Sequence, residues 1–161
     1  MSSDSLRRTR RLSVAAVILI SMWMFGNLYE AVVTNAALLA DPRPGSFPDE
    51  FAAGSPFYYY VPWGPLGVAA MLAVRVRFGG EVSVTVRRYW NFSLAALGIA
   101  LAVKIALIVG VNPALRDPGR SAAAVGDYAV LWALGNGLAV LASAAALALF
   151  AVCRRPVAES A

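Results

Sequence analysis

The sequence predicts an all-α fold, a bundle of four transmembrane helices with both chain termini in the cytoplasm. Three observations lead to this prediction: the composition, the length of the apolar runs and the distribution of the arginines. Of the 161 residues, 60% are hydrophobic and 14% are charged, whereas soluble domains carry about 25% charged residues. The apolar residues form long runs instead of a stripe at helical spacing, and a helix that is apolar on all sides needs an apolar surrounding such as lipid.

The apolar runs set the number and the limits of the predicted helices. A bilayer core about 30 Å thick requires roughly 20 apolar residues in a helix that crosses it. Four such runs predict one integral membrane domain over residues 1–161, with spans at about 12–40, 57–76, 89–111 and 128–152. A signal peptide is the alternative for the first run, but that run is long and contains polar residues. Each run has its own marker residues: Asn27, Glu30 and Asn35 in the first, Pro62 and Pro65 near the start of the second, Lys104 in the third, and Asn136 and Ser143 in the fourth.

The arginines predict the orientation of these helices. Lys and Arg in short loops collect on the cytoplasmic side. Ten basic residues lie at the two termini and around the loop over 77–88, whereas the other two loops hold three. We therefore expect a multi-pass protein of the cell membrane with both termini cytoplasmic. The net charge of +5 comes largely from arginines beside apolar runs, which indicates membrane lipids as partners and not nucleic acid.

The chain offers few groups for metal or cofactor chemistry. It has no His and a single cysteine, Cys153. We therefore expect no metal, no cofactor, no intramolecular disulfide and no catalytic set that depends on His.

Two ionisable residues, Glu30 and Lys104, lie well inside the predicted spans. At about 1.5 Å per residue, Glu30, Lys104 and Asn136 lie roughly 24 to 28 Å from the nearest cytoplasmic arginines, and Tyr59 and Tyr60 lie at roughly 23 Å. Four helices thus place polar groups at one level, in the outer half of the membrane. Because a charge in lipid costs a few kcal/mol or more, we expect Glu30 and Lys104 to form an ion pair inside the bundle. The alternative is that both side chains are neutral.

The helical faces agree with a polar pocket that faces the interior of the bundle. Trp23, Asn27 and Glu30 share one face of the first helix by their spacing, as Trp132 and Asn136 do on the fourth. Simpler interpretations stay open: a pair that only fixes helix register, an interhelical hydrogen bond at Asn136, and tyrosines that anchor the membrane interface. We predict Glu30 and Lys104 as catalytic residues. The predicted substrate-binding residues are Trp23, Asn27, Tyr59, Tyr60, Trp132 and Asn136.

Three short motifs carry a resemblance to a known family. They are Gly26-Asn27-Leu28-Tyr29-Glu30 in the first helix, Asn112-Pro113 with Arg116 after the third, and Trp132 with Asn136 in the fourth. In this order they resemble the anthrone-oxygenase-like family of small four-span membrane proteins. The resemblance covers about residues 20–140 and implies a four-helix bundle. Fungal members of that family are linked to cofactor-independent oxidation of anthrones to anthraquinones.

The match is partial at the position that matters most for such a reaction. Asn27 and Glu30 fit the first-helix pattern and Trp132 fits the fourth, but Asn136 stands where the family usually shows His, and Ala139 where an Arg is often found. Asn cannot act as a general base. If the resemblance holds, Glu30 is the remaining candidate base, with Lys104 as the electrostatic partner of a phenolate or enolate.

Three classes of function therefore remain, and whether the chain is an enzyme stays open. The first is a membrane protein that binds or oxidises a small lipophilic aromatic or quinone-like molecule, with Glu30 and Lys104 exposed to a closed pocket. The second is a structural or accessory subunit, in which the polar groups pair fully with each other and an oligomer or protein partner completes the assembly. The third is a small transporter, although no inverted repeat is evident in the sequence.

Overall fold

The computed structural model describes residues 3–49, 51–53, 55, 57–60 and 62–152, and the side chains of 3–6, 59, 60 and 152 lie outside this description. All regular elements in the described part are helical, which confirms the predicted all-α class. In chain order they are α1 (Ser3–Tyr29), η1 (Glu30–Thr34), α2 (Asn35–Ala40), α3 (Phe57–Tyr60), α4 (Trp63–Phe78), α5 (Val84–Ala106), η2 (Leu107–Val111), α6 (Asn112–Arg116) and α7 (Ala122–Val152). The elements η1 and η2 are single π-helical turns inside two long continuous helices, 3–40 and 84–116.

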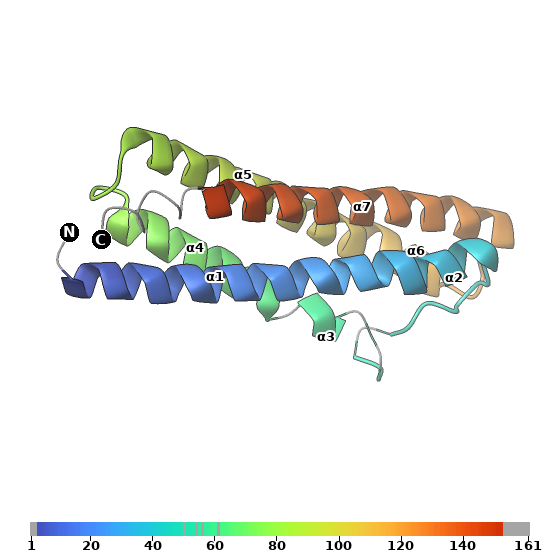
Figure 1. Ribbon diagram of the computed structural model, residues 1–161. Coiled ribbons are helices and arrows are strands. Elements are labelled where there is room, and N and C mark those ends of the chain that lie inside the picture. Colours follow the sequence, from blue (N-terminus) through green and yellow to red (C-terminus); the bar gives the residue numbers. More distant parts are fainter. Residues whose placement is uncertain (1–2, 50, 54, 56, 61, 153–161) are drawn as a thin grey trace.

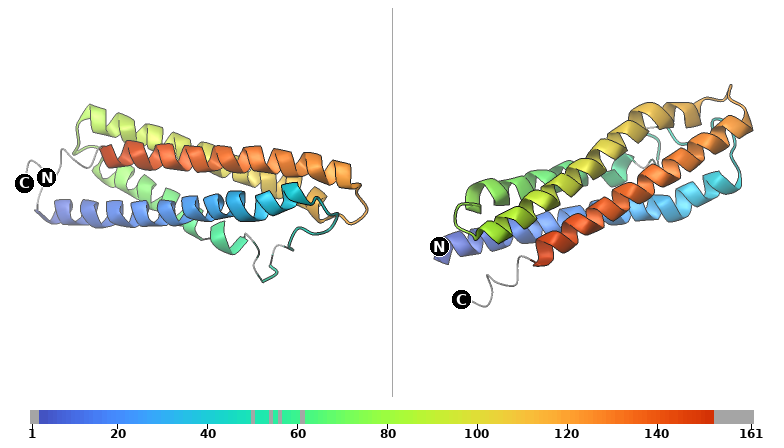
Figure 2. Two further views of the ribbon diagram at one scale, coloured as in Figure 1. Left: turned by 45° about the vertical axis from the view of Figure 1, so that its right-hand side comes forward. Right: turned by 90° about the horizontal axis from the view of Figure 1, so that it is seen from above.

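The helices run alternately up and down and lie side by side in a bundle (Figures 1 and 2). Helix α1 packs against α4 and α7, and α5 packs against α7 and α4. Helices α1 and α5 therefore face each other across the diagonal of the bundle. The start of α1, the end of α4, the start of α5 and the end of α7 lie at one end of the molecule (Figure 1).

Three of the helices are long and apolar enough to cross a membrane: Arg7–Ala40, Val84–Arg116 and Ala122–Ala151. The predicted second span, 57–76, is divided into the short α3 and the 16-residue α4. Pro62 stands directly before α4, where its carbonyl accepts a hydrogen bond from Leu66 N at 3.1 Å. Proline lacks the N–H that a continuous helix would use and disfavours helical geometry in the residue before it. At the usual rise per residue, α4 is only about 24 Å long.

Because α4 is short, the two halves of the bundle are built differently. Helix α4 accompanies the long helices from the end where α1 begins to about mid-length, and beyond it the three long helices continue with α3 beside α1 (Figure 1). We call the end where α1 begins the basic end and the opposite one the distal end. Eight described arginines lie at the basic end: Arg7, Arg8, Arg10, Arg11, Arg75, Arg77, Arg87 and Arg88. Arg154 and Arg155, also predicted there, lie outside the described residues.

The buried apolar side chains form two clusters. The basic-end cluster includes Ala16, Ile20, Trp23, Met71, Leu97, Ala100, Ala139, Ala146 and Phe150. The distal cluster consists of Leu38, Phe47, Leu107, Val111, Leu115, Val125, Ala129 and Trp132. On each long helix the buried polar residue predicted from the sequence lies between the two clusters: Glu30 on the first, Lys104 on α5 and Asn136 on α7. The polar residues thus form a layer across the middle of the bundle.

Candidate functional site: a buried polar layer

Lys104 is the centre of the polar layer. Its ammonium group donates hydrogen bonds to Glu30 Oε2 at 2.8 Å and to Asn136 Oδ1 at 2.9 Å. The three residues come from three helices and are almost fully buried, with exposed fractions of 3%, 1% and 0% for Lys104, Glu30 and Asn136. The structure thus confirms the predicted Glu30–Lys104 ion pair, which joins η1 to α5 across the diagonal of the bundle.

Two asparagines extend this network along α1. Asn136 Nδ2 donates to the backbone carbonyl of Asn27 at 3.0 Å, and Asn27 Nδ2 donates to the carbonyl of Trp23 at 2.7 Å. Side-chain amides can donate and accept at the same time, so Asn136 links the Lys104 ammonium to the α1 backbone. A buried ion pair needs such additional hydrogen bonds to offset the loss of water around both charges.

Both π-helical turns lie next to the ion pair. The turn η1 begins at Glu30, and η2 begins three residues after Lys104. Each ends at an asparagine whose backbone N–H bonds to the carbonyl five residues earlier: Asn35 to Glu30, and Asn112 to Leu107. In a regular α-helix a residue five positions on lies on a different face. The extra residue in each turn rotates these asparagines inward, and both are buried. Single π turns of this kind are frequent at functional sites.

Trp132 separates the polar layer from the distal end. Its Nε1–H donates to Asn112 Oδ1 at 3.0 Å, which fixes the orientation of the indole. The Lys104 ammonium lies 5.3 Å from the centroid of the Trp132 ring, within the range of a cation–π interaction. The Phe47 ring meets the same indole edge-on, with centroids 5.3 Å apart and an interplanar angle of 77°. Sequence reasoning placed Trp132 in the site but missed Asn112, Asn35 and Phe47.

Three buried oxygen atoms of the first long helix have no hydrogen-bond donor among the described residues. They are Asn27 Oδ1, Glu30 Oε1 and Asn35 Oδ1. Leaving a buried polar group without a partner costs about 1–3 kcal/mol, and more for a charged one. All three atoms are acceptors on consecutive turns of one helix, so the layer has an excess of acceptors on the α1 side.

The remaining predicted residues are placed differently. The Trp23 ring belongs to the basic-end cluster, where it packs so closely on Gly64 that a Cβ there would lie 2.9 Å from the indole. Only the Trp23 carbonyl joins the polar network. The side chains of Tyr59 and Tyr60 lie outside the described residues, although α3, which carries them, packs against α1.

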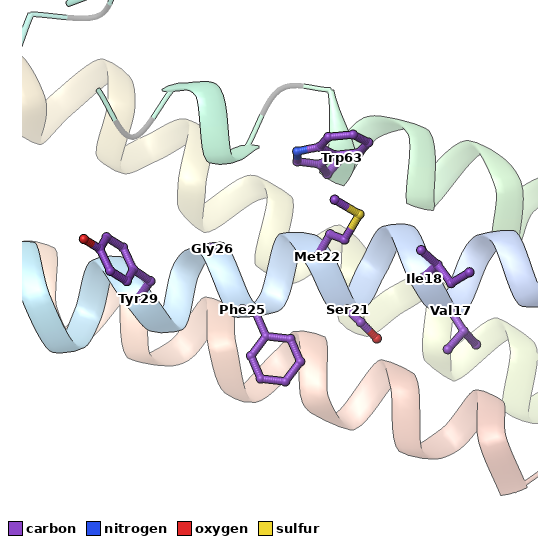
Figure 3. Close-up of a pocket in the computed structure, with 8 residues that line it drawn as sticks. All are labelled: Val17, Ile18, Ser21, Met22, Phe25, Gly26, Tyr29 and Trp63. Atoms are coloured by element: carbon purple, nitrogen blue, oxygen red, sulfur yellow. The ribbon is translucent and has the colours of Figure 1, made fainter. Parts of the chain in front are cut away.

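Two of the hollows on the surface of the described part of the bundle are lined by neither Glu30 nor Lys104. The larger, of about 780 Å³, runs along the outside of α1 between Val17 and Tyr29 and includes Trp63. Figure 3 shows Trp63 on the same side of α1 as Met22, with Phe25 on the opposite side. The smaller, of about 490 Å³, lies between α2 and the segment after it. Because Glu30 and Lys104 are both buried, the ion pair is enclosed by protein in this conformation. Among the described residues no three His, Cys, Asp or Glu side chains form a metal-binding group.

Comparisons of the chain with protein-family models, with curated proteins and with solved structures find no match. The resemblance to the anthrone-oxygenase-like family therefore stays a prediction.

Proposed function

We propose that this chain is a four-span membrane protein with cytoplasmic termini, and that its polar layer binds a small lipophilic aromatic molecule carrying a hydroxyl group. Glu30 accepts the hydrogen bond of that hydroxyl, and Lys104 lies beside the oxygen that carries it. The observation that supports this most strongly is the unpaired Glu30 Oε1, a buried carboxylate oxygen next to an ammonium group in a bundle with apolar helices.

The membrane topology is supported by the positions of the charges. The described arginines of the basic end lie on the side that the positive-inside rule assigns to the cytoplasm. The distal end carries Arg43, Arg116 and Arg120 together with acidic residues such as Asp41 and Asp117. In this topology α3 and α4 form the fourth span together, and the polar layer lies in the outer half of the bilayer.

The chemical class of the ligand is supported by the excess of acceptors. Asn27 Oδ1, Glu30 Oε1 and Asn35 Oδ1 lack hydrogen-bond donors; a phenol supplies one donor and a quinol two, whereas a quinone supplies none. The apolar clusters on both sides of the layer favour a ligand whose remaining surface is apolar. The hydroxyl-bearing form of a quinone-like molecule is therefore favoured over the oxidised form.

The same geometry suits a proton transfer. When Glu30 takes the hydroxyl proton, the ligand O–H bond breaks and the proton resides on the carboxylate, while the ligand oxygen becomes an anion beside the Lys104 ammonium. Preorganised positive charge stabilises such an anion strongly in a site without water. The oxidation that the resemblance implies would begin with removal of a proton in this way.

A structural role for the ion pair is the second candidate. It is favoured by the two short hydrogen bonds of the Lys104 ammonium, which satisfy this charge without a ligand. Glu30→Gln with Lys104→Met removes both charges together and keeps the side-chain volumes, so a bundle that only needs paired charges still folds. The two candidates differ in whether this folded double variant also loses a ligand.

The test is native mass spectrometry of the protein extracted gently from its own membrane, with subsequent release and identification of small molecules. We expect a hydroxylated aromatic compound with the wild-type protein and none with the folded Glu30→Gln/Lys104→Met protein. Asp127→Asn, which removes an exposed carboxylate at the distal end, is the matched control and retains the compound. A thermal-shift titration adds specificity: 1-naphthol stabilises the wild type more than 1-methoxynaphthalene, which lacks the donor. Equal shifts with both compounds, or a compound retained by the double variant, would contradict the proposal.

A further inference from the structure

Phe47 is a buried aromatic residue in the segment that follows α2, and its neighbours along the chain are exposed or half-buried. We propose that the space its ring occupies is a binding site for an aromatic ring, that Phe47 fills it as a removable plug, and that this space is the entrance to the polar layer from the distal end. We call this space the ring site and residues 41–49 the plug segment. That the site serves as a ligand entrance rests on the function proposed above, whereas the plug itself does not.

Most of the plug segment lies on the surface, whereas its Phe47 side chain is buried. Phe47 is 4% exposed, yet its neighbours Gly45, Ser46 and Asp49 are exposed. The backbone turns at Gly45, which has a φ of +72°, a conformation that glycine adopts without strain. The segment thus makes a tight turn on the surface and directs a single ring into the bundle.

The ring site has the features of an aromatic recognition site. Trp132 provides an edge-on partner for the Phe47 ring, and the Arg116 guanidinium lies 5.6 Å from the ring centroid. Edge-to-face packing and a cation over the ring each favour an aromatic group over an aliphatic one of equal size. Aliphatic side chains of the distal cluster complete the site, including Leu38, Val111 and Leu115.

Trp132 joins the ring site to the polar layer. The same indole that meets Phe47 has the Lys104 ammonium 5.3 Å from its centroid. Removal of the Phe47 ring would therefore expose Trp132, and a movement of that indole would open the way to Lys104 and Glu30. This route would give a ligand access to an ion pair whose two residues are buried.

The backbone hydrogen bonds within the plug segment are local, and Gly45 also packs closely against Pro118. These hydrogen bonds join Arg43 to Asp41 and Ser46 to Arg43. A longer-range bond runs from Arg116 Nε to the Pro48 carbonyl at 2.8 Å. The hollow of about 490 Å³ between α2 and this segment is lined by Phe47 itself, so open space borders the segment on the side of its buried ring.

The experiment measures access to the ring site with a cysteine reporter. Ala129 is a fully buried residue of the distal cluster and Ala146 one of the basic-end cluster. Each is replaced by cysteine in a Cys153→Ser background, and the full chain in detergent micelles is treated with a charged methanethiosulfonate reagent. In Phe47→Ala we expect Ala129→Cys to react more than about tenfold faster, because the plug loses the packing that closed the site. Ala146→Cys stays protected.

Two matched variants and a small aromatic probe sharpen the result. Phe51→Ala removes a phenylalanine from the same connection that is 69% exposed, and we expect no change in the reaction rate. Phenol refills the ring site in Phe47→Ala and slows the modification of Ala129→Cys about fivefold more than cyclohexanol does at equal concentration. Phe47→Leu carries the same test with less risk to folding, since it keeps an apolar side chain but no ring.

The outcomes separate the plug from the proposed function. An unchanged rate at Ala129→Cys in both Phe47 variants, or equal protection by phenol and cyclohexanol, would overturn the ring site. Reaction of Ala146→Cys as well would show that Phe47 holds the whole bundle together and is no plug. If Ala129→Cys behaves as expected and 1-naphthol still binds the Glu30→Gln/Lys104→Met protein, the function proposed for the polar layer is contradicted and the plug is supported.

Discussion

The two halves of this bundle differ in how their buried polar groups are paired. In the half near the basic end, two buried hydroxyls donate to backbone carbonyls: Ser93 Oγ to Ala146 O at 2.6 Å, and Ser143 Oγ to Ala139 O at 2.7 Å. The ion pair and the three unpaired acceptors lie at mid-length, and both π-helical turns lie there or towards the distal end. We therefore propose that the basic-end half mainly holds the helices together and that the polar layer with the distal half forms the binding site.

The largest change in the free energy of unfolding is expected at the ion pair. Lys104→Met leaves the Glu30 carboxylate buried without its partner, and we expect a loss of about 3–5 kcal/mol in the free energy of unfolding. Adding Glu30→Gln removes the unpaired charge and recovers most of that loss. Reversible unfolding in detergent micelles measures both variants, with Ser93→Ala as the basic-end reference, for which we expect about 1 kcal/mol. A double variant no more stable than Lys104→Met would contradict the pairing.

The ion pair is also the part of the site that the sequence predicts best. A carboxylate and an ammonium at similar depths in apolar helices have few partners other than each other. The apolar runs likewise predict the three long helices, because the length needed to cross a bilayer is fixed. The spacing also predicts Trp23 on the same polar face, but helix side chains tilt toward the N-terminus, and its ring lies one turn closer to the basic end, against Gly64.

The features missed from the sequence share a physical cause. The predicted helical faces assume the regular α-helical period, and a single π turn shifts every later residue of the helix relative to that period. Asn35 and Asn112 therefore face inward although the spacing does not predict it. Phe47 lies in a connection with no periodicity, so its burial depends on tertiary packing alone. The division of the second span at Pro62 had a visible signal, the proline itself.

The close packing of the basic-end half gives the next test. A Cβ at Gly64 would lie 2.9 Å from the Trp23 ring, whereas one at Gly137 meets nothing within 4 Å. We expect Gly64→Ala to lower the free energy of unfolding by about 1–3 kcal/mol through overpacking. Gly137→Ala is neutral or slightly stabilising, because alanine favours the helix. Equal unfolding energies for the two variants would show that α4 does not depend on this contact.

Asn112 tests whether the second π turn has a role. Asn112→Ala removes the acceptor of the Trp132 Nε1–H, and an unpaired buried donor costs about 1–3 kcal/mol. We also expect the indole to lose its fixed orientation, which the near-ultraviolet circular dichroism of the protein reports. Asn112→Asp, which keeps an acceptor at the same position, is the control and retains that signal. An unchanged spectrum in Asn112→Ala would mean that packing alone orients Trp132.

The smallest effect on stability is expected at Asn35, and it distinguishes the two halves most directly. Its Oδ1 has no donor among the described residues, so Asn35→Ala removes a polar group that costs free energy in the absence of a ligand. We expect the free energy of unfolding to stay the same or rise by up to about 1 kcal/mol. The thermal shift given by 1,5-dihydroxynaphthalene, which has a second hydroxyl to donate to Asn35, falls at the same time, whereas the shift given by 1-naphthol, whose one hydroxyl donates to Glu30, is unchanged. Buried polar residues kept only for structure would give the opposite pattern, a loss of stability with no change in either shift, and in that case the distal half is a second structural core.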